Sequence, residues 1–215
     1  MERLEPVICR GGWDGRAVAQ RVVDELAAHG CAVMYNHPIW SRVDPADVVG
    51  LEGCFAIEVH NFGTVEECAL GHDTLFWDLM LRRGQRLGGV ASDDNHNAPE
   101  LPDSFGGWVV VAAPELTRDA VVRALVEGAF YASSGPSIEN WGVRDGRAWV
   151  ACSPCERVSL IAGGPVGVGE THRSAGGPLL EYAEFELNGT ETYLRFECVD
   201  ATGHAAWSNP LYPEA

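Results

Sequence analysis

The chain contains no lysine, so all 15 of its basic residues are arginines, and 31 acidic residues outnumber them. The formal net charge of -16 predicts a surface that repels phosphate backbones, which argues against nucleic acid as a partner. A small phosphorylated substrate is not excluded, because a bound divalent metal inverts the local field. No apolar run approaches the ~18 residues of a membrane helix, and Met1 to Pro6 show no apolar signal-peptide core. We therefore expect no membrane partner.

Several catalytic motifs are also missing. The chain has no G-x-S-x-G, P-loop or G-x-G-x-x-G sequence, which removes the commonest serine-hydrolase and nucleotide-binding signatures. The segment Ser133 to Pro136 offers two serines, but no histidine or acid is spaced to support a nucleophile, so we interpret it as a turn. Seven scattered cysteines, an odd number, favour reduced thiols and a cytoplasmic location over a disulfide framework.

Cys152 and Cys155 have the C-x-x-C spacing. A structural zinc site normally needs a second pair, and no second pair exists in the chain. A thioredoxin-like motif needs a helix after the first cysteine, whereas β-type sequence flanks this pair. The sequence therefore favours a turn that carries two small buried thiols.

The first part of the chain alternates between helical and strand patterns. Such alternation predicts a parallel sheet or barrel whose functional groups lie at the carboxyl ends of the strands. The predicted helices cover residues 14–28, 44–51, 65–83 with an interruption near Gly71, and 117–128. The predicted strands cover residues 31–35, 54–59, 87–92, 108–112 and 130–133.

The pattern changes after Ser134-Gly135-Pro136. Short β runs separated by glycine-rich turns follow, and no helical pattern of comparable strength appears. We expect two domains: residues 1–136 as an α/β domain and residues 137–215 as a small antiparallel β domain of the sandwich type. The β runs of the second domain cover residues 148–151, 158–162, 183–187 and 193–199.

Two predicted strands are followed by residues of types that commonly bind metals. Asp94 and His96 follow the run 87–92, and His37 follows the run 31–35. Divalent transition metals accept this combination of carboxylate oxygen and imidazole nitrogen. The structural alternative for Asp94 and His96 is a solvated loop with an aspartate cap. For His37 it is a hydrogen-bonded turn residue.

Other polar residues would reach the same edge of the sheet. Glu58 lies late in its strand, and Asn61 follows shortly after it. The alternative for Glu58 is a strand carboxylate that pairs with an arginine. His60 can point into the same layer as Glu58, but we do not assign it as a ligand, and we expect His72 and His29 to be surface residues.

Several of these segments, taken in order along nearly the whole chain, resemble the polymerase-and-histidinol-phosphatase (PHP) family. The last two of them resemble its two-domain bacterial members, which carry a β domain after the catalytic one. The segments are Asn36 to Ser41, Ile57 to Asn61, Trp77-Asp78, Gly88 to His96, Phe130 to Pro136 and Ala206 to Pro210.

The resemblance implies a distorted (β/α)7 barrel that binds divalent metals, usually zinc, manganese or iron. It also implies hydrolysis of phosphate esters by metal-activated water. By resemblance, His37, Asp94 and His96 are metal ligands. We assign Asp93, Glu58 and Asn36 to catalysis.

One part of the family pattern is missing, because the family opens with a His-x-His strand and the first histidine of this chain is His29. We therefore expect a partial, truncated PHP barrel followed by the β-sandwich-like domain, with metal binding weak or absent. Three explanations stay open: a segment encoded upstream of Met1, an evolutionary remnant, or a partner chain, such as a second copy, that covers the exposed strand edges.

The expected function is accordingly that of an incomplete metal-dependent phosphoesterase acting on a small phosphorylated substrate. Two alternatives remain: a non-catalytic binding or assembly module derived from that fold, and a metal-dependent hydrolase of another bond, such as an amide.

Overall fold

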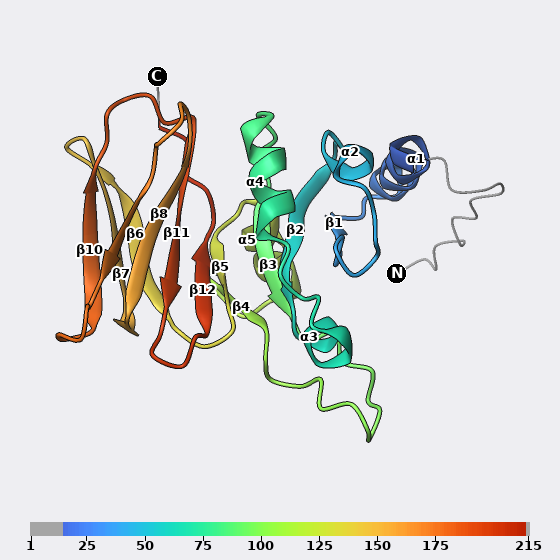
Figure 1. Cartoon of the computed structure of the whole chain (residues 1–215). Helices are drawn as coiled ribbons and strands as arrows, with labels where there is room; N and C mark the ends of the chain where they lie inside the picture. Colours follow the sequence, from blue (N-terminus) through green and yellow to red (C-terminus); the bar gives the residue numbers. More distant parts are fainter. Residues whose placement is uncertain (1–14, 214–215) are drawn as a thin grey trace.

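The computed structural model describes residues 15–213 of the chain, so Met1 to Pro6 and the predicted helix start at Asp14 lie outside the described residues. Three sheets and five helices make up this part. Helices α1 to α4 lie with the parallel sheet on one side of the molecule, and the antiparallel sheets form the other side (Figure 1). The helices are α1 (Gly15–Ala28), α2 (Pro45–Val48), α3 (Phe62–Cys68), α4 (Thr74–Arg82) and α5 (Arg118–Val126).

The parallel sheet contains β1 (Val33–Tyr35), β2 (Cys54–Asn61) and β3 (Gly88–Ser92), in that order. The last six residues of β2 are buried, as expected of a central parallel strand that is covered on both faces. Helix α4 packs on this sheet through the fully buried Trp77. A Cβ atom at Gly89 would stand 2.8 Å from the Trp77 ring, so the close approach of helix and strand requires glycine there.

Two antiparallel sheets face each other around a second core. One has the order β10-β7-β6 and the other the order β4-β5-β12-β11-β8-β9. Apolar residues from both sheets, including Phe185 and Phe196, meet between them. The strands are β4 (Trp108–Val111), β5 (Phe130–Ser133), β6 (Ile138–Arg144), β7 (Arg147–Cys155), β8 (Arg157–Gly163), β9 (Glu170–Arg173), β10 (Leu180–Glu186), β11 (Tyr193–Val199) and β12 (Ala205–Ser208).

The expected partial (β/α)7 barrel is wrong. Within residues 15–213, parallel pairing is confined to β1, β2 and β3, and no sheet closes on itself. Strand β4 pairs antiparallel with β5, and β5 in turn pairs antiparallel with β12. A helix between two strands predicts parallel neighbours only when it crosses over the sheet, whereas α5 connects adjacent strands of opposite direction. The other edge of β5 is therefore occupied by β12 and not by a parallel strand.

The division into residues 1–136 and 137–215 stays a prediction. The six-stranded sheet draws β4 and β5 from before residue 136 and its other four strands from after it. Three strands in the second part, β6, β9 and β12, have no counterpart among the predicted β runs.

Local sequence signals account for the helix ends. The side chain of Asp44 accepts a hydrogen bond from the Ala46 N–H at the start of α2, and Thr117 caps α5 in the same way. The predicted interruption near Gly71 is confirmed, since α3 ends before it and α4 begins after it. A Cβ atom at Gly71 would collide with the Asn61 carbonyl, so this turn also requires glycine. Among the described helices, none is both long and apolar enough to cross a membrane.

A buried ion pair joins α4 to the six-stranded sheet. The guanidinium of Arg195 in β11 donates to both carboxylate oxygens of Asp78, at 3.0 Å each from Nη2. It also stacks on the Trp77 ring, with Cζ 4.5 Å from the ring centroid. The Arg195 side chain is only 2% exposed, so this charge depends on Asp78 for compensation.

We expect Asp78→Ala to lower the free energy of unfolding by about 3–5 kcal/mol, because it leaves a buried guanidinium without its partner. Urea denaturation measures the loss. Arg147→Ala, which breaks exposed pairs with Glu184 and Glu186, is the matched control and should have a much smaller effect on stability. Equal losses in the two variants would contradict the assigned role of the buried pair.

Candidate functional site

The carboxylate of Glu58 accepts hydrogen bonds from residues at the carboxyl ends of all three parallel strands. Its Oε2 accepts the backbone N–H of His37, just past β1, at 2.8 Å, and the Asn61 amide of β2 at 2.9 Å. Its Oε1 accepts the hydroxyl of Ser92, at the end of β3. Glu58 is fully buried, and no arginine among residues 15–213 is one of its partners, so the arginine alternative is wrong for the described part of the chain.

Asn61 connects Glu58 to the next carboxylate. Its Nδ2 also donates to Asp94 Oδ2 at 3.1 Å, so one amide nitrogen links two acidic side chains on neighbouring strand ends. Its Oδ1 accepts the Thr64 N–H at 2.9 Å and thereby caps α3. The sequence placed Asn61 near this edge, and the structure does bring it there.

His37 and Asn36 occupy the turn after β1. His37 has a backbone φ of 30°, and its Nδ1 lies 3.0 Å from the Ser41 hydroxyl. Its backbone contacts Glu58, but its ring packs edge-on against Trp40. Asn36 is exposed. The His37 main chain therefore belongs to the Glu58 cluster, while its imidazole contacts Ser41 and Trp40 of the same turn.

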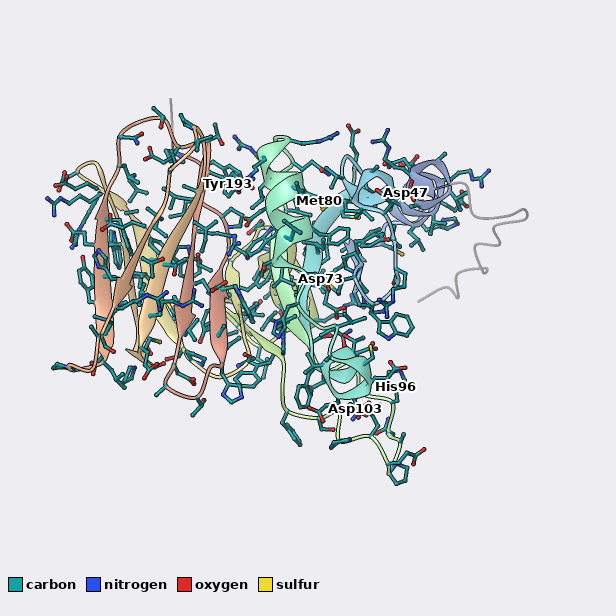
Figure 2. All side chains as sticks on the ribbon, viewed as in Figure 1. Asp47, Asp73, Met80, His96, Asp103 and Tyr193 are labelled. Atoms are coloured by element: carbon teal, nitrogen blue, oxygen red, sulfur yellow. The ribbon has the colours of Figure 1, made fainter. Side chains whose placement is uncertain are left out.

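Asp73 is a member of this region that the sequence did not reveal. It lies before α4, beside the parallel strands (Figure 2), and is fully buried. Its Oδ1 accepts the Ile39 N–H at 2.8 Å and holds the turn after β1, while Oδ2 has no hydrogen-bond partner in the described part of the chain. Burial is the largest influence on this carboxyl group, and together with the Glu58 charge it outweighs the Ile39 N–H and raises the pKa of Asp73 from 3.8 to about 7. No spacing in the sequence links Asp73 to His37 or Glu58.

Asp93 and His96 serve the loop that follows β3. The carboxylate of Asp93 accepts three backbone N–H groups, from Phe105 at 2.7 Å, Gly106 at 2.8 Å and Gly107 at 2.9 Å. His96 donates its backbone N–H to Asp103 Oδ2 at 2.7 Å, and its Nδ1 lies 3.1 Å from the same oxygen. His96 and Asp103 lie together beyond α3, away from Asp73 (Figure 2).

Asp94 does not share its position with His96. Asp94 has a φ of 50°, a left-handed conformation that is uncommon for residues other than glycine. That conformation redirects the chain between the two side chains, so Asp94 turns toward Asn61 while His96 turns toward Asp103. The alternation assumed for an Asp-x-His pair on an extended strand does not apply here.

The described residues do not fit a complete metal centre. Among residues 15–213, no three histidine, cysteine, aspartate or glutamate side chains are grouped so that they could hold one ion. Both oxygens of Glu58 already accept hydrogen bonds, from three protein donors in all, and the imidazole of His96 is paired with Asp103. Asp73 Oδ2 and the Asp94 carboxylate are the oxygens with capacity to spare.

The C-x-x-C pair lies within β7 rather than in a turn. Pro154 has no N–H, and the pairing with β10 slips between Ala151 and Cys155, so a bulge returns Cys155 to the core side. Both thiols are buried, as expected, and they contact a third, Cys198 of the facing sheet. The hydrogen bonds they share lower the pKa of Cys152 and raise that of Cys155.

No family model matches the chain, and no curated protein matches it. A solved structure from Bacteroides vulgatus, described as a two-domain protein containing a predicted PHP-like metal-dependent phosphoesterase, is remotely similar. It is 12% identical, with a TM-score of 0.39, and the match covers 93% of this chain and 67% of that one. At this TM-score the likeness carries no inference about chemistry.

We expect Glu58→Gln to lower the free energy of unfolding by about 1–3 kcal/mol, because the NH2 of the new amide would replace one carboxylate oxygen and face a buried donor instead of accepting from it. Thermal and urea denaturation measure this loss. Glu66→Gln, at an exposed position of α3, should change stability by less than about 0.5 kcal/mol. A Glu58→Gln protein as stable as wild type would contradict the central role of this carboxylate.

The raised pKa of Asp73 predicts a pH dependence. Between pH 4 and 7 the folded state keeps a proton that the unfolded state releases, so the stabilising contribution is complete below pH 4 and is lost as the pH rises through 7. The loss amounts to about 4 kcal/mol. Asp73→Asn should lack this contribution, so the unfolding free energy of wild type relative to Asp73→Asn should fall when denaturation is measured from pH 4.5 to 8. The exposed control Asp145→Asn should retain this contribution.

Proposed function

We propose that this chain carries part of the site of a divalent-metal-dependent phosphoesterase, at the carboxyl ends of β1, β2 and β3. The observation that supports the proposal is the link that Asn61 makes between the Glu58 and Asp94 carboxylates, with His37 bound to the same cluster. Polar groups with metal-binding chemistry are thus concentrated at the edge where parallel strands place their functional residues.

In this proposal Asp94 and His37 would hold a metal, and His96 would do so only if its loop left Asp103. A bound divalent ion would polarise a phosphoryl oxygen and activate water. Both carboxylate oxygens of Glu58 and of Asp93 accept hydrogen bonds from protein donors. We therefore assign Glu58 to positioning the strand ends and Asp93 to positioning the 93–107 loop. Asn36, exposed beside the cluster, would contact a small phosphorylated substrate.

The two candidate ligands are fewer than hydrolysis by metal-activated water requires. The proposal therefore includes ligands from outside the described residues or from another chain. The six described cysteines are all free thiols, which supports a cytoplasmic location for such an enzyme.

A second candidate is a non-catalytic binding or assembly module. The observation that favours it is the saturation of Glu58 by three internal donors, which is the arrangement of a structural carboxylate.

Manganese binding separates the two candidates, because Mn²⁺ prefers carboxylate oxygen. We expect the 215-residue chain to bind about one Mn²⁺ weakly in calorimetry, and Asp94→Asn or His37→Ala to weaken binding roughly tenfold or more. Glu100→Gln, an exposed acid in the same loop, is the control and should leave binding unchanged.

The same chain should show no hydrolysis of p-nitrophenyl phosphate, or of a matched amide substrate, beyond that of the metal alone. Binding that is unaffected by both substitutions would overturn the phosphoesterase proposal in favour of the module. Turnover with two or more bound metals would instead show that the ligand set is complete.

A further inference from the structure

A second cluster of metal-binding side chains lies outside the site described above. The end of β2 pairs antiparallel with residues 71–73, where His60 stands opposite His72. The Asn61 N–H donates to the Gly71 carbonyl at 2.9 Å, and the Asp73 N–H donates to the Val59 carbonyl at 3.0 Å. These two bonds flank the histidines, which therefore form a non-hydrogen-bonded pair. In an antiparallel ladder, such pairs bring side chains closest together.

The two imidazoles face each other through the same ring atom. His60 Nδ1 and His72 Nδ1 are 3.4 Å apart, and the ring centroids are 5.0 Å apart. Two nitrogen ligands at roughly 2.0–2.1 Å from one tetrahedral ion stand roughly 3.4 Å from each other. The observed separation therefore suits two ligands of a single ion.

The contacts of His60 leave its Nδ1 unprotonated, so this nitrogen has a lone pair that can bind an ion. Its Nε2 lies 3.1 Å from the Gly106 carbonyl, which accepts only and so assigns the ring proton to Nε2. Metal-binding histidines commonly donate their second N–H to a backbone carbonyl in this way. Trp207 stacks on the His60 ring at 5.6 Å and fixes its plane. Burial, followed by the nearby His72, lowers the pKa of His60 to about 4, so the ring is neutral at pH 7.

We propose that His60 and His72 form a two-imidazole binding site for a divalent transition-metal ion such as Zn²⁺, Ni²⁺ or Cu²⁺. His72 is exposed and admits the ion, while water completes the coordination shell. Imidazole nitrogen favours these ions over Mn²⁺ or Mg²⁺. Nearby Asp93 is committed to three backbone N–H groups and stays a neighbour rather than a ligand. Without the ion, the same nitrogen separation suits a hydrogen bond from His72 to His60.

The test is a titration of the full chain with Ni²⁺ and Cu²⁺, followed by calorimetry and by tryptophan fluorescence. We expect one ion at this site that quenches tryptophan fluorescence, tighter binding of Cu²⁺ than of Ni²⁺ there, and quenching that is largely lost in Trp207→Phe. His72→Ala should weaken binding roughly tenfold or more. Because His72 is exposed, this variant is expected to fold even where His60→Ala does not.

Two controls identify the location of the ion. His29→Ala, at another exposed histidine, should bind Ni²⁺ at this site as wild type does, whereas His37→Ala reports on any ion held at the strand-end cluster and should leave the fluorescence quenching intact. The bound ion should also raise the melting temperature of wild type but not that of His72→Ala. Unchanged affinity in His72→Ala, or affinity lost only in His37→Ala, would overturn the proposal and leave the pair as a hydrogen bond.

Discussion

The buried carboxylate of Glu58 is the constraint around which the candidate site is organised. It lies at the centre of a parallel sheet, where a charge without partners would be very costly. Donors from the ends of β1, β2 and β3 converge on it, so its solvation by protein also fixes how these ends are arranged. The positions of His37, Asn61 and Ser92 are therefore linked, and a change at any one of them alters the surroundings of the others.

The same convergence accounts for the difference between the expected and the observed chemistry. Acidic and amide side chains lie together at this edge of the sheet because the carboxyl ends of parallel strands meet there. Their position alone does not make them metal ligands. In this chain, most of their hydrogen-bonding capacity is used within the protein. Asp73 is the exception, since one of its buried oxygens has no partner among the described residues, and burial favours the protonated form because that form carries no charge.

Local patterns in the sequence predicted much of the secondary structure, because caps and periodicity act over a few residues. Asp44 and Thr117 cap the starts of helices, and β11 covers residues 193–199, which the sequence predicted as a β run. Strand direction depended on long-range pairing, and the pairing of β5 with β12 joins residues far apart in sequence. The site followed the same division: Glu58 and Asn61 were placed by their strand, whereas Asp73 and the pairing of His60 with His72 arise from a turn whose geometry no motif announces.

The ion pair between Asp78 and Arg195 bears on how this protein can change over evolutionary time. It connects a helix on the parallel sheet to a strand near the end of the chain, and the Arg195 guanidinium also stacks on the Trp77 ring. A gene rearrangement that exchanged either segment for a foreign one would separate a buried cation from its counter-ion. Either segment can therefore be exchanged without loss of charge compensation only if its partner segment is exchanged with it.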